Sequence, residues 1–406
     1  MTRLPEPPSS AGVPAAPLIP DGAPAPADGT TAAQVAQAGR SGSRRGLSGR
    51  RIAAAGVLVA AVAFGAVRAG TVAGTPATGA AAPETRWSAA AVEPPVPATP
   101  FTTTPPTAAP ASFDPVVRFA RFGWLPGGMV PRTTIVQAGP HGAYAMEAGL
   151  PKSSIGARVL VTFFPQGVPP HRDCSLAAGA MPRSVEPAAA APAVAPAVRG
   201  RPATWTDGAL RWEYAPGAWA EIVGQELTPT REDTAAELAA LARIAGDLRF
   251  GTASLRFPLA VPPPAEGLRL AAAWVTEQSK VGWTGSLVFA AGDYCPDPKG
   301  LAQGVLSVGV TGIIPGYGWT GDHSNATVDG HRAIRQDLPG GGKALAVYGD
   351  PGPYVSLGAS DGEIAALLGA GGLEGFYRHV QVLAQPDLHA LAEPADQAGW
   401  TTDPVR

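Results

Sequence analysis

The chain has 406 residues, of which 51 are Gly and 45 are Pro, and its formal net charge is −2. Charged residues make up 15% of the chain, compared with roughly 25% in an average soluble domain. This charge balance argues against a nucleic-acid-binding protein, because neutralising phosphates requires a basic surface.

Residues 1–51 predict a disordered segment that ends in a basic cluster. They are rich in Pro, Ala, Gly and Ser and contain few large apolar side chains. Such a segment cannot bury enough surface to offset the entropy lost on ordering. The arginines that close it are Arg40, Arg44, Arg45, Arg50 and Arg51. We expect a disordered cytoplasmic tail.

An uncharged stretch follows and predicts a single transmembrane helix at 52–73. The first charge after residue 51 is Arg68, and an arginine near a helix end can reach the membrane interface. Arginines before the span place the N-terminus in the cytoplasm and the rest of the chain outside. Two alternatives stay open. The first is a buried helix of a soluble domain, which would have only Pro-rich polar sequence beside it. The second is a cleaved export signal, which the twin-arginine-like segment Ser43–Leu47 suggests.

Residues 74–112 predict a linker rich in Pro, Thr and Ala. Pro-rich segments favour the extended polyproline conformation, which rises about 3.1 Å per residue. A linker of this length could hold a domain up to about 100 Å from the bilayer.

A weak internal repeat divides the rest of the chain. Residues 198–219 alternate apolar and polar side chains around Gly and Pro-Gly turns, and residues 328–354 do the same. Such patterns are typical of antiparallel hairpins. A helical pattern follows each copy, at 234–248 and at 362–373.

We therefore expect an α+β fold of two tandem modules, each a curled antiparallel sheet with one main helix. The modules are predicted at 113–253 and 254–385, and a C-terminal tail at 386–406. A repeat of this length can bury its own core, so two copies suffice. The Pro- and Ala-rich residues 186–197 are expected to form a solvated loop in the first module.

The order of motifs within each copy resembles a known domain of unknown function. In the first copy it reads Val198-Arg199-Gly200-Arg201, a Leu-X-Trp strand that begins at Leu210, a turn, an aromatic strand and a helix. The similar domain occurs in the extracytoplasmic parts of actinobacterial single-pass proteins related to anti-sigma factors and sporulation regulators. The resemblance implies a convex antiparallel sheet and a role in envelope sensing or regulation, without catalytic residues. Residues 1–51 depart from an anti-sigma factor because they lack a His/Cys zinc motif and an amphipathic helix.

Residues 358–362 match the G-x-S-x-G pattern of a serine nucleophile. The sequence contains no HGGG-type loop to accompany it. A helix N-cap explains the same residues, because Ser360 with Glu363 three positions later forms a capping box. We expect the cap, and therefore no catalytic residue, no cofactor and no enzyme.

The cysteines and histidines give no metal site. Cys174 and Cys295 are the only cysteines. Outside the membrane they are more often bonded than free, so a disulfide between them is a candidate and two free thiols stay open. The six histidines lack metal-ligand spacing, and His171 lies in a Pro-rich loop.

Aromatic residues supply the only candidates for ligand binding. Trp212 and Trp219 lie in the predicted hairpin strands and are expected to pack in the core or on a sheet face. Tyr317 and Trp319 lie in a Gly-rich loop and are weak candidates for an exposed contact. The sequence favours a membrane-anchored extracytoplasmic binding module, single-pass in the cell membrane, with an unknown protein or envelope ligand as partner. The alternative is an exported structural or cell-wall-associated protein without a signalling role, and a hydrolase is less favoured.

Overall fold

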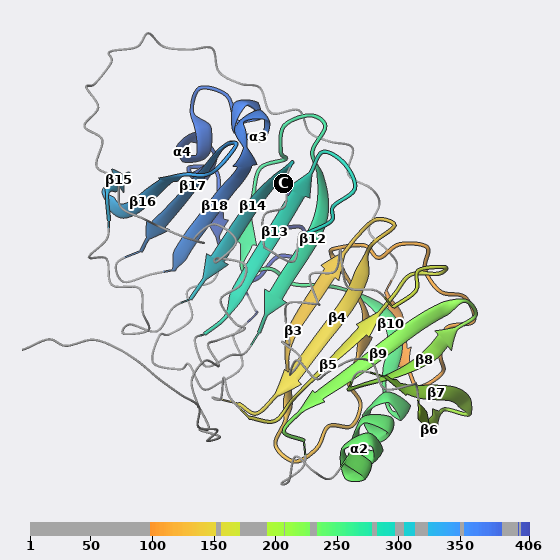
Figure 1. Ribbon diagram of the computed structural model, residues 1–406. Coiled ribbons are helices and arrows are strands. Elements are labelled where there is room, and N and C mark those ends of the chain that lie inside the picture. The colour runs from red at the N-terminus through yellow and green to blue at the C-terminus, as the bar shows by residue number, and fades with distance from the viewer. Residues whose placement is uncertain are drawn as a thin grey trace, which may run out of the picture. The chain divides into compact units, whose positions relative to one another are not determined.

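The computed structural model describes residues 98–151, 156–170, 193–206, 208–227, 234–277, 282–296, 304–312, 324–349, 353–383, 397 and 399–406 (Figure 1). The expected tail at 1–51, the expected transmembrane helix at 52–73 and most of the expected linker lie outside these residues. Among the described residues, no helix is long and apolar enough to cross a membrane.

The described residues form mainly antiparallel sheet with few helices, which confirms the α+β class in this general sense. Fourteen of the described strands make one sheet, in the order β15-β16-β17-β18-β14-β13-β12-β3-β4-β5-β9-β8-β7-β6 (Figure 1). One half, the first strand set, contains β3 (Val130–Gln137), β4 (Ala143–Gly149), β5 (Arg158–Phe163), β6 (Ala193–Val198), β7 (Arg201–Thr206), β8 (Ala209–Ala215) and β9 (Ala218–Gln225). The other half, the second strand set, contains β12 (Arg269–Thr276), β13 (Thr284–Ala290), β14 (Val305–Thr311), β15 (Ala326–Val328), β16 (His331–Asp337), β17 (Gly341–Tyr348) and β18 (Tyr354–Asp361).

The two strand sets have the same internal order. Outward from the middle of the sheet, the first reads β3-β4-β5-β9-β8-β7-β6 and the second reads β12-β13-β14-β18-β17-β16-β15. The strands outside the main sheet also occupy corresponding places. β2 (Val117–Arg121) pairs with β10 (Arg249–Ser254), and β11 (Leu259–Ala260) pairs with β19 (Gln381–Val382).

The strand sets meet where β3 pairs with β12, a boundary that we call the seam. The pairing is antiparallel and centres on Ile135 opposite Trp274. At one end of it, the hydroxyl oxygens of Thr133 and Thr276 lie 3.1 Å apart and form a buried hydrogen bond. Backbone pairing across the seam therefore makes one continuous sheet of both sets.

One face of this sheet carries the main hydrophobic core. Because side chains alternate between the two faces of a strand, every second residue of each strand points into it. Leu241, Ile244 and Leu248 from α2 (Thr234–Gly246) and its C-terminal end cover the first set. Ile364 from α3 (Gly362–Leu367) and Phe376 from α4 (Gly372–Tyr377) cover the second. The apolar cluster is continuous across the seam.

The second strand set is followed by two short helices, where the sequence predicts one main helix at 362–373. Positive φ angles of 69° and 52° occur at Gly369, just after α3, and at Gly372, the first residue of α4. Left-handed backbone of this kind ends an α-helix, and glycine adopts it without steric cost.

Two segments that the composition assigns to linker and loop are strands in the structure. β1 (Thr99–Thr102) pairs with β10, so the folded region begins within the expected linker 74–112. β6 occupies 193–198 and pairs with β7, within and just beyond the expected loop 186–197. β6 lies at the sheet edge, where Pro196 is tolerated because an edge strand does not need every backbone N–H for pairing.

The last residues of the chain also pack onto the fold. Thr401 exchanges backbone hydrogen bonds with Phe257, and Trp400 is buried in the main core. This part of the expected tail 386–406 therefore belongs to the folded structure.

Corresponding hairpin turns tie the outer strands of each set to a helix. Arg199-Gly200 joins β6 to β7, and Asp329-Gly330 joins β15 to β16, with positive φ at all four residues. Arg199 Nε donates to the Gly246 carbonyl at 3.0 Å, and its Nη2 donates to the Leu248 carbonyl, so this side chain caps the end of α2.

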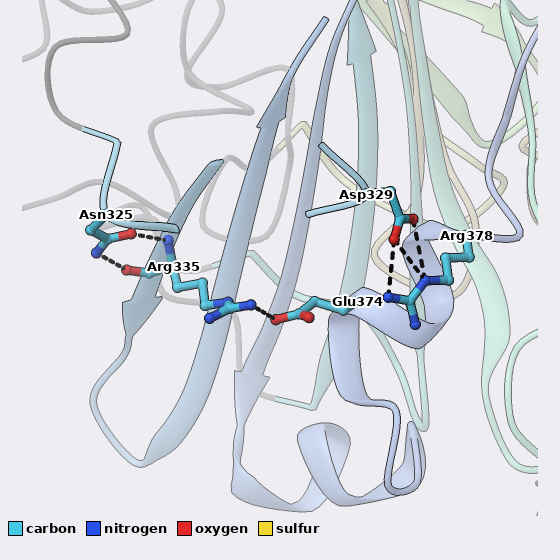
Figure 2. Close-up of polar contacts among 5 residues, drawn as sticks. All are labelled: Asn325, Asp329, Arg335, Glu374 and Arg378. Atoms are coloured by element: carbon cyan, nitrogen blue, oxygen red, sulfur yellow. Dashed lines mark hydrogen bonds and ion pairs between the residues drawn. The ribbon is translucent and has the colours of Figure 1, made fainter. Parts of the chain in front are cut away.

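In the second set the charges at this place are reversed. Asp329 accepts hydrogen bonds of 3.1–3.2 Å from Arg378, the residue at the C-terminal end of α4 (Figure 2). Figure 2 also shows Arg335 paired with Glu374 of α4 at 2.5 Å, and Asn325 bonded to the Arg335 backbone. An acidic turn and a basic helix end thus replace the direct cap made by Arg199.

Candidate functional site at the seam

The aromatic candidates Tyr317 and Trp319 lie outside the described residues, so their role in binding stays a prediction. Cys295 is disulfide-bonded. The only other cysteine of the chain, Cys174, lies outside the described residues, as does His171. The pairing of Cys174 with Cys295 therefore also stays a prediction.

The capping-box prediction that Ser360 caps the following helix is wrong. Asp361 is the N-cap residue of α3. The Asp361 carboxylate accepts a hydrogen bond of 2.9 Å from the Ile364 N–H, and Asp361 has the extended backbone of an N-cap residue. The Ser360 hydroxyl instead accepts from the Val305 N–H at 2.9 Å and donates to Asp361 at 2.8 Å. The capping motif therefore begins one residue later than the Ser360–Glu363 spacing predicts.

The hydrogen bonds of Asp361 keep its side chain ionised. Burial alone would raise the pKa of this carboxyl, but donors from Ile364, Gly304 and Ser360 outweigh burial and hold the pKa below its usual value. Gly304 N–H donates at 2.7 Å from the loop before β14. A lowered pKa means that the stability contributed by Asp361 is present above the pKa of an unfolded Asp and is lost as the pH falls through the folded value.

The two hairpin tryptophans differ in burial. Trp212 on β8 is 3% exposed and belongs to the main core, as predicted. Trp219 on β9 is 37% exposed and lies on the sheet's other face. A single exposed tryptophan is common on protein surfaces and does not by itself mark a binding site.

A small, partly open cavity lies at one end of the seam. Its charged lining comes from Arg118 and Arg121 of β2, Arg132 of β3 and Glu277, the residue after β12. Thr133, Thr134 and the buried side chain of Met146 also line it. Both strand sets therefore contribute charged groups to one cavity.

Arg118 on β2 and Glu277, the residue after β12, form an ion pair beside the seam. Arg118 Nη2 lies 2.5 Å from Glu277 Oε1, and both side chains are about three-quarters buried. Burial alone would lower the pKa of Arg118, but the Glu277 carboxylate outweighs it and holds the pKa above its usual value. The Glu277 N–H also donates to the Arg132 carbonyl at 2.8 Å. Glu277 thus contacts β2 through its side chain and β3 through its backbone.

A second charged group adjoins the cavity. Glu147 Oε1 lies 3.9 Å from Arg132 Nη1, and the nearby Arg158 donates to Gln225 at 2.6 Å. Gly149 leaves room for Arg132, because a Cβ there would lie 3.0 Å from Arg132 Nη1 and that side chain would have to shift slightly. Burial raises the pKa of Glu147, although Arg132 and Arg158 act in the opposite direction.

Sequence reasoning did not identify this cavity. Arg118 and Glu277 are 159 positions apart, and neither belongs to a motif with a characteristic spacing. The one available signal was the density of charge around β2, in a chain with only 15% charged residues. The charge density does not predict which of these side chains contact one another.

The described residues contain no group of three or more His, Cys, Asp or Glu side chains that could hold a metal ion. No family model matches the chain, and searches of curated proteins and of solved structures find no similar protein.

Proposed function

We propose that the protein is a membrane-anchored extracytoplasmic binding protein whose folded region takes a ligand at the seam. The observation that carries the binding role is the cavity that Arg118, Arg121, Arg132 and Glu277 line. A partly open cavity with a charged lining can admit a polar group of a ligand.

The membrane anchor is proposed from the sequence alone. The uncharged segment at 52–73, with arginines before it, supports a single-pass helix with a cytoplasmic N-terminus. The folded residues would then lie outside the cell membrane, where disulfides persist. The disulfide bond of Cys295 is consistent with that compartment.

We further propose that the strand sets are tandem modules. The shared strand order and the corresponding hairpin turns support this origin. A binding role is preferred to hydrolysis because the Ser360 hydroxyl bonds to Val305 and to Asp361, the residue that caps α3. A role in envelope sensing or regulation rests on the resemblance of the motif order alone. An exported structural or wall-associated protein is the second candidate, favoured by the Pro-rich composition of residues 74–112.

The test is the position and location of the N-terminus, measured by mass spectrometry of membrane and secreted fractions. We expect peptides from residues 1–51 on a membrane-bound chain. Protease added to intact cells should remove the folded region and leave those peptides protected. A new N-terminus near residues 70–82 on a released protein would contradict the anchor and leave the exported alternative.

A further inference from the structure

We propose that the seam is a self-complementary interface, in which the β3 edge of one module fits a second copy of the same module. The chain is then a fused dimer, and the seam is its dimer interface. This inference rests on the proposed tandem modules and adds the surface by which one module recognises another.

The strand register identifies equivalent residues in the two strand sets. The sequence repeat aligns Leu210 of β8 with Leu345 of β17, and from each of them a row of cross-strand partners leads to the seam. The row in the first set is Leu210, Ile222, Val161, Met146 and Thr134. The row in the second set is Leu345, Leu357, Val308, Leu287 and Ala273. Thr134 and Ala273 therefore occupy equivalent positions at the seam.

Equivalent residues lie opposite one another at the centre of the seam. One position beyond Thr134 and Ala273 come Ile135 and Trp274, which are equivalent and pair directly with each other. On the two sides of this pair, Thr134 lies opposite Val275 and Val136 lies opposite Ala273. Because Val136 is the equivalent of Val275, these are the same pair seen from each set. A two-fold axis between Ile135 and Trp274 produces this exchange of partners.

Backbone hydrogen bonds at the two ends of the seam obey the same axis. The Glu277 N–H donates to the Arg132 carbonyl at 2.8 Å, and the Ala138 N–H donates to the Ala271 carbonyl at 2.8 Å. In the same alignment Ala138 is equivalent to Glu277, and Arg132 is equivalent to Ala271. Each set therefore gives at one end of the seam the bond that it receives at the other.

The backbone irregularities beside the seam match as well. The pairing of β3 with β4 shifts its register between Pro131 and Thr133, and the pairing of β12 with β13 shifts between Leu270 and Ala272. These positions are equivalent in the alignment. Because a register shift bends a strand, both edges have the same bend, and this shape belongs to the module.

The side chains break the symmetry. Arg132 and Glu277 line the cavity at one end of the seam, whereas their equivalents at the other end are Ala271 and Ala138. A dimer of identical modules would carry the same side chains at both ends. Fusion into one chain allows the two ends to differ, which accounts for charged residues at one end only.

A free β3 edge should therefore pair with β3 of a second copy, with Ile135 opposite Ile135. In the intact chain β12 occupies this edge. Ala271 and Glu277 direct backbone groups toward β3, and because backbone groups alternate along a strand, Val275 does so too. Ile135 then belongs to a pair without direct hydrogen bonds, in which the Cα atoms lie about 4.5 Å apart.

The test frees the β3 edge in the purified full-length chain in detergent. Val275→Pro removes an N–H directed at β3, and proline is not tolerated in the middle of a sheet. We expect this variant to sediment as a dimer. Val275→Ala is the matched control, because it keeps the N–H and should remain monomeric like the unchanged chain.

A cysteine on the two-fold axis locates the interface. Ile135→Cys added to Val275→Pro should join two chains by a disulfide under mild oxidation, because a Cα separation of about 4.5 Å is within disulfide range. Thr133→Cys is the control for register. Its two copies would lie about 13 Å apart along the strands, so it should crosslink at least about tenfold less. Peptide mass spectrometry identifies the linked residues.

Two results would overturn the proposal: a folded Val275→Pro variant that stays monomeric, or crosslinking at Thr133→Cys equal to that at Ile135→Cys. If Val275→Pro does not fold, hydrogen exchange of the unchanged chain decides. Protection factors of the equivalent amides of Ala138 and Glu277 should agree within about tenfold, and a larger difference would contradict the two-fold axis. A negative result leaves the tandem modules and the membrane anchor standing, because the strand order and the N-terminus are established separately.

Discussion

Replacing Phe163 by Ala is expected to lower the free energy of unfolding by about 3–5 kcal/mol, the usual cost of removing a buried aromatic ring. Phe163 on β5 is 0% exposed. Its ring centroid lies 5.6 Å from Phe119 on β2, 5.2 Å from Tyr214 on β8 and 5.6 Å from Phe250 on β10. The substitution would leave a cavity between the main sheet and the β2–β10 layer, which neighbouring rings cannot easily fill.

Urea unfolding of the full chain, followed by tryptophan fluorescence, measures this loss. Because the main core is continuous across the seam, we expect one transition that moves as a whole to lower urea. Val194→Ala is the control, since Val194 is 95% exposed and should change stability by less than about 0.5 kcal/mol. A loss below about 1 kcal/mol, or a second transition that Phe163→Ala does not move, would contradict a single shared core.

Replacing Arg199 by Ala is expected to cost about 1–3 kcal/mol, because partly buried carbonyls at the end of α2 would lose a charged donor. Arg199 bonds to the carbonyls of Gly246 and Leu248, and its guanidinium lies 5.4 Å from the centroid of the Phe250 ring. The end of α2 would lose its hydrogen bonds to the β6–β7 hairpin. Urea unfolding measures the cost, and hydrogen exchange of α2 locates it.

The corresponding place in the second strand set supplies the control for Arg199. Arg378→Gln removes the exposed ion pair with Asp329. The Asp329 carboxylate then bonds to water instead of to Arg378. We expect a smaller loss than for Arg199→Ala, because exposed ion pairs contribute little to stability. Equal losses for the two variants would show that the cap on the carbonyls of α2 is not what Arg199 contributes.

Local patterns in the sequence predicted local structure well. The alternation at 198–219 and 328–354 predicted antiparallel hairpins, and β6 to β9 and β15 to β18 confirm them. The helical pattern at 234–248 predicted α2. These features depend on neighbouring residues, which is why periodicity could identify them.

Local composition and spacing did not predict β1, β6 and the cap of α3 correctly. β1 and β6 contain proline and small residues that favour loops, yet each pairs with a strand at the edge of a sheet. Asp361 caps α3 instead of Ser360, because Ser360 accepts a hydrogen bond from Val305 on β14, a strand 55 positions away in the chain. Long-range contacts hold β1 and Ser360, whereas β6 pairs with β7, its neighbour in the chain across the Arg199-Gly200 turn.

The seam was beyond the reach of a single sequence. Nothing in β3 or β12 distinguishes a central strand from an edge strand, and Thr133 and Thr276 meet across 143 positions. Arg118, Glu277 and Arg132 are brought together only because that pairing exists. The candidate site therefore depends on the seam.

Residue-resolved hydrogen exchange of the full-length chain tests the seam most directly. If β3 and β12 pair as described, the amides that bond across the seam should exchange as slowly as those of the interior strands β4 and β13. Amides of the edge strands β6 and β15 should exchange faster, because one side of each has no neighbour in the sheet order. Exchange at β3 and β12 as fast as at β6 and β15 would contradict the continuous sheet and the site that depends on it.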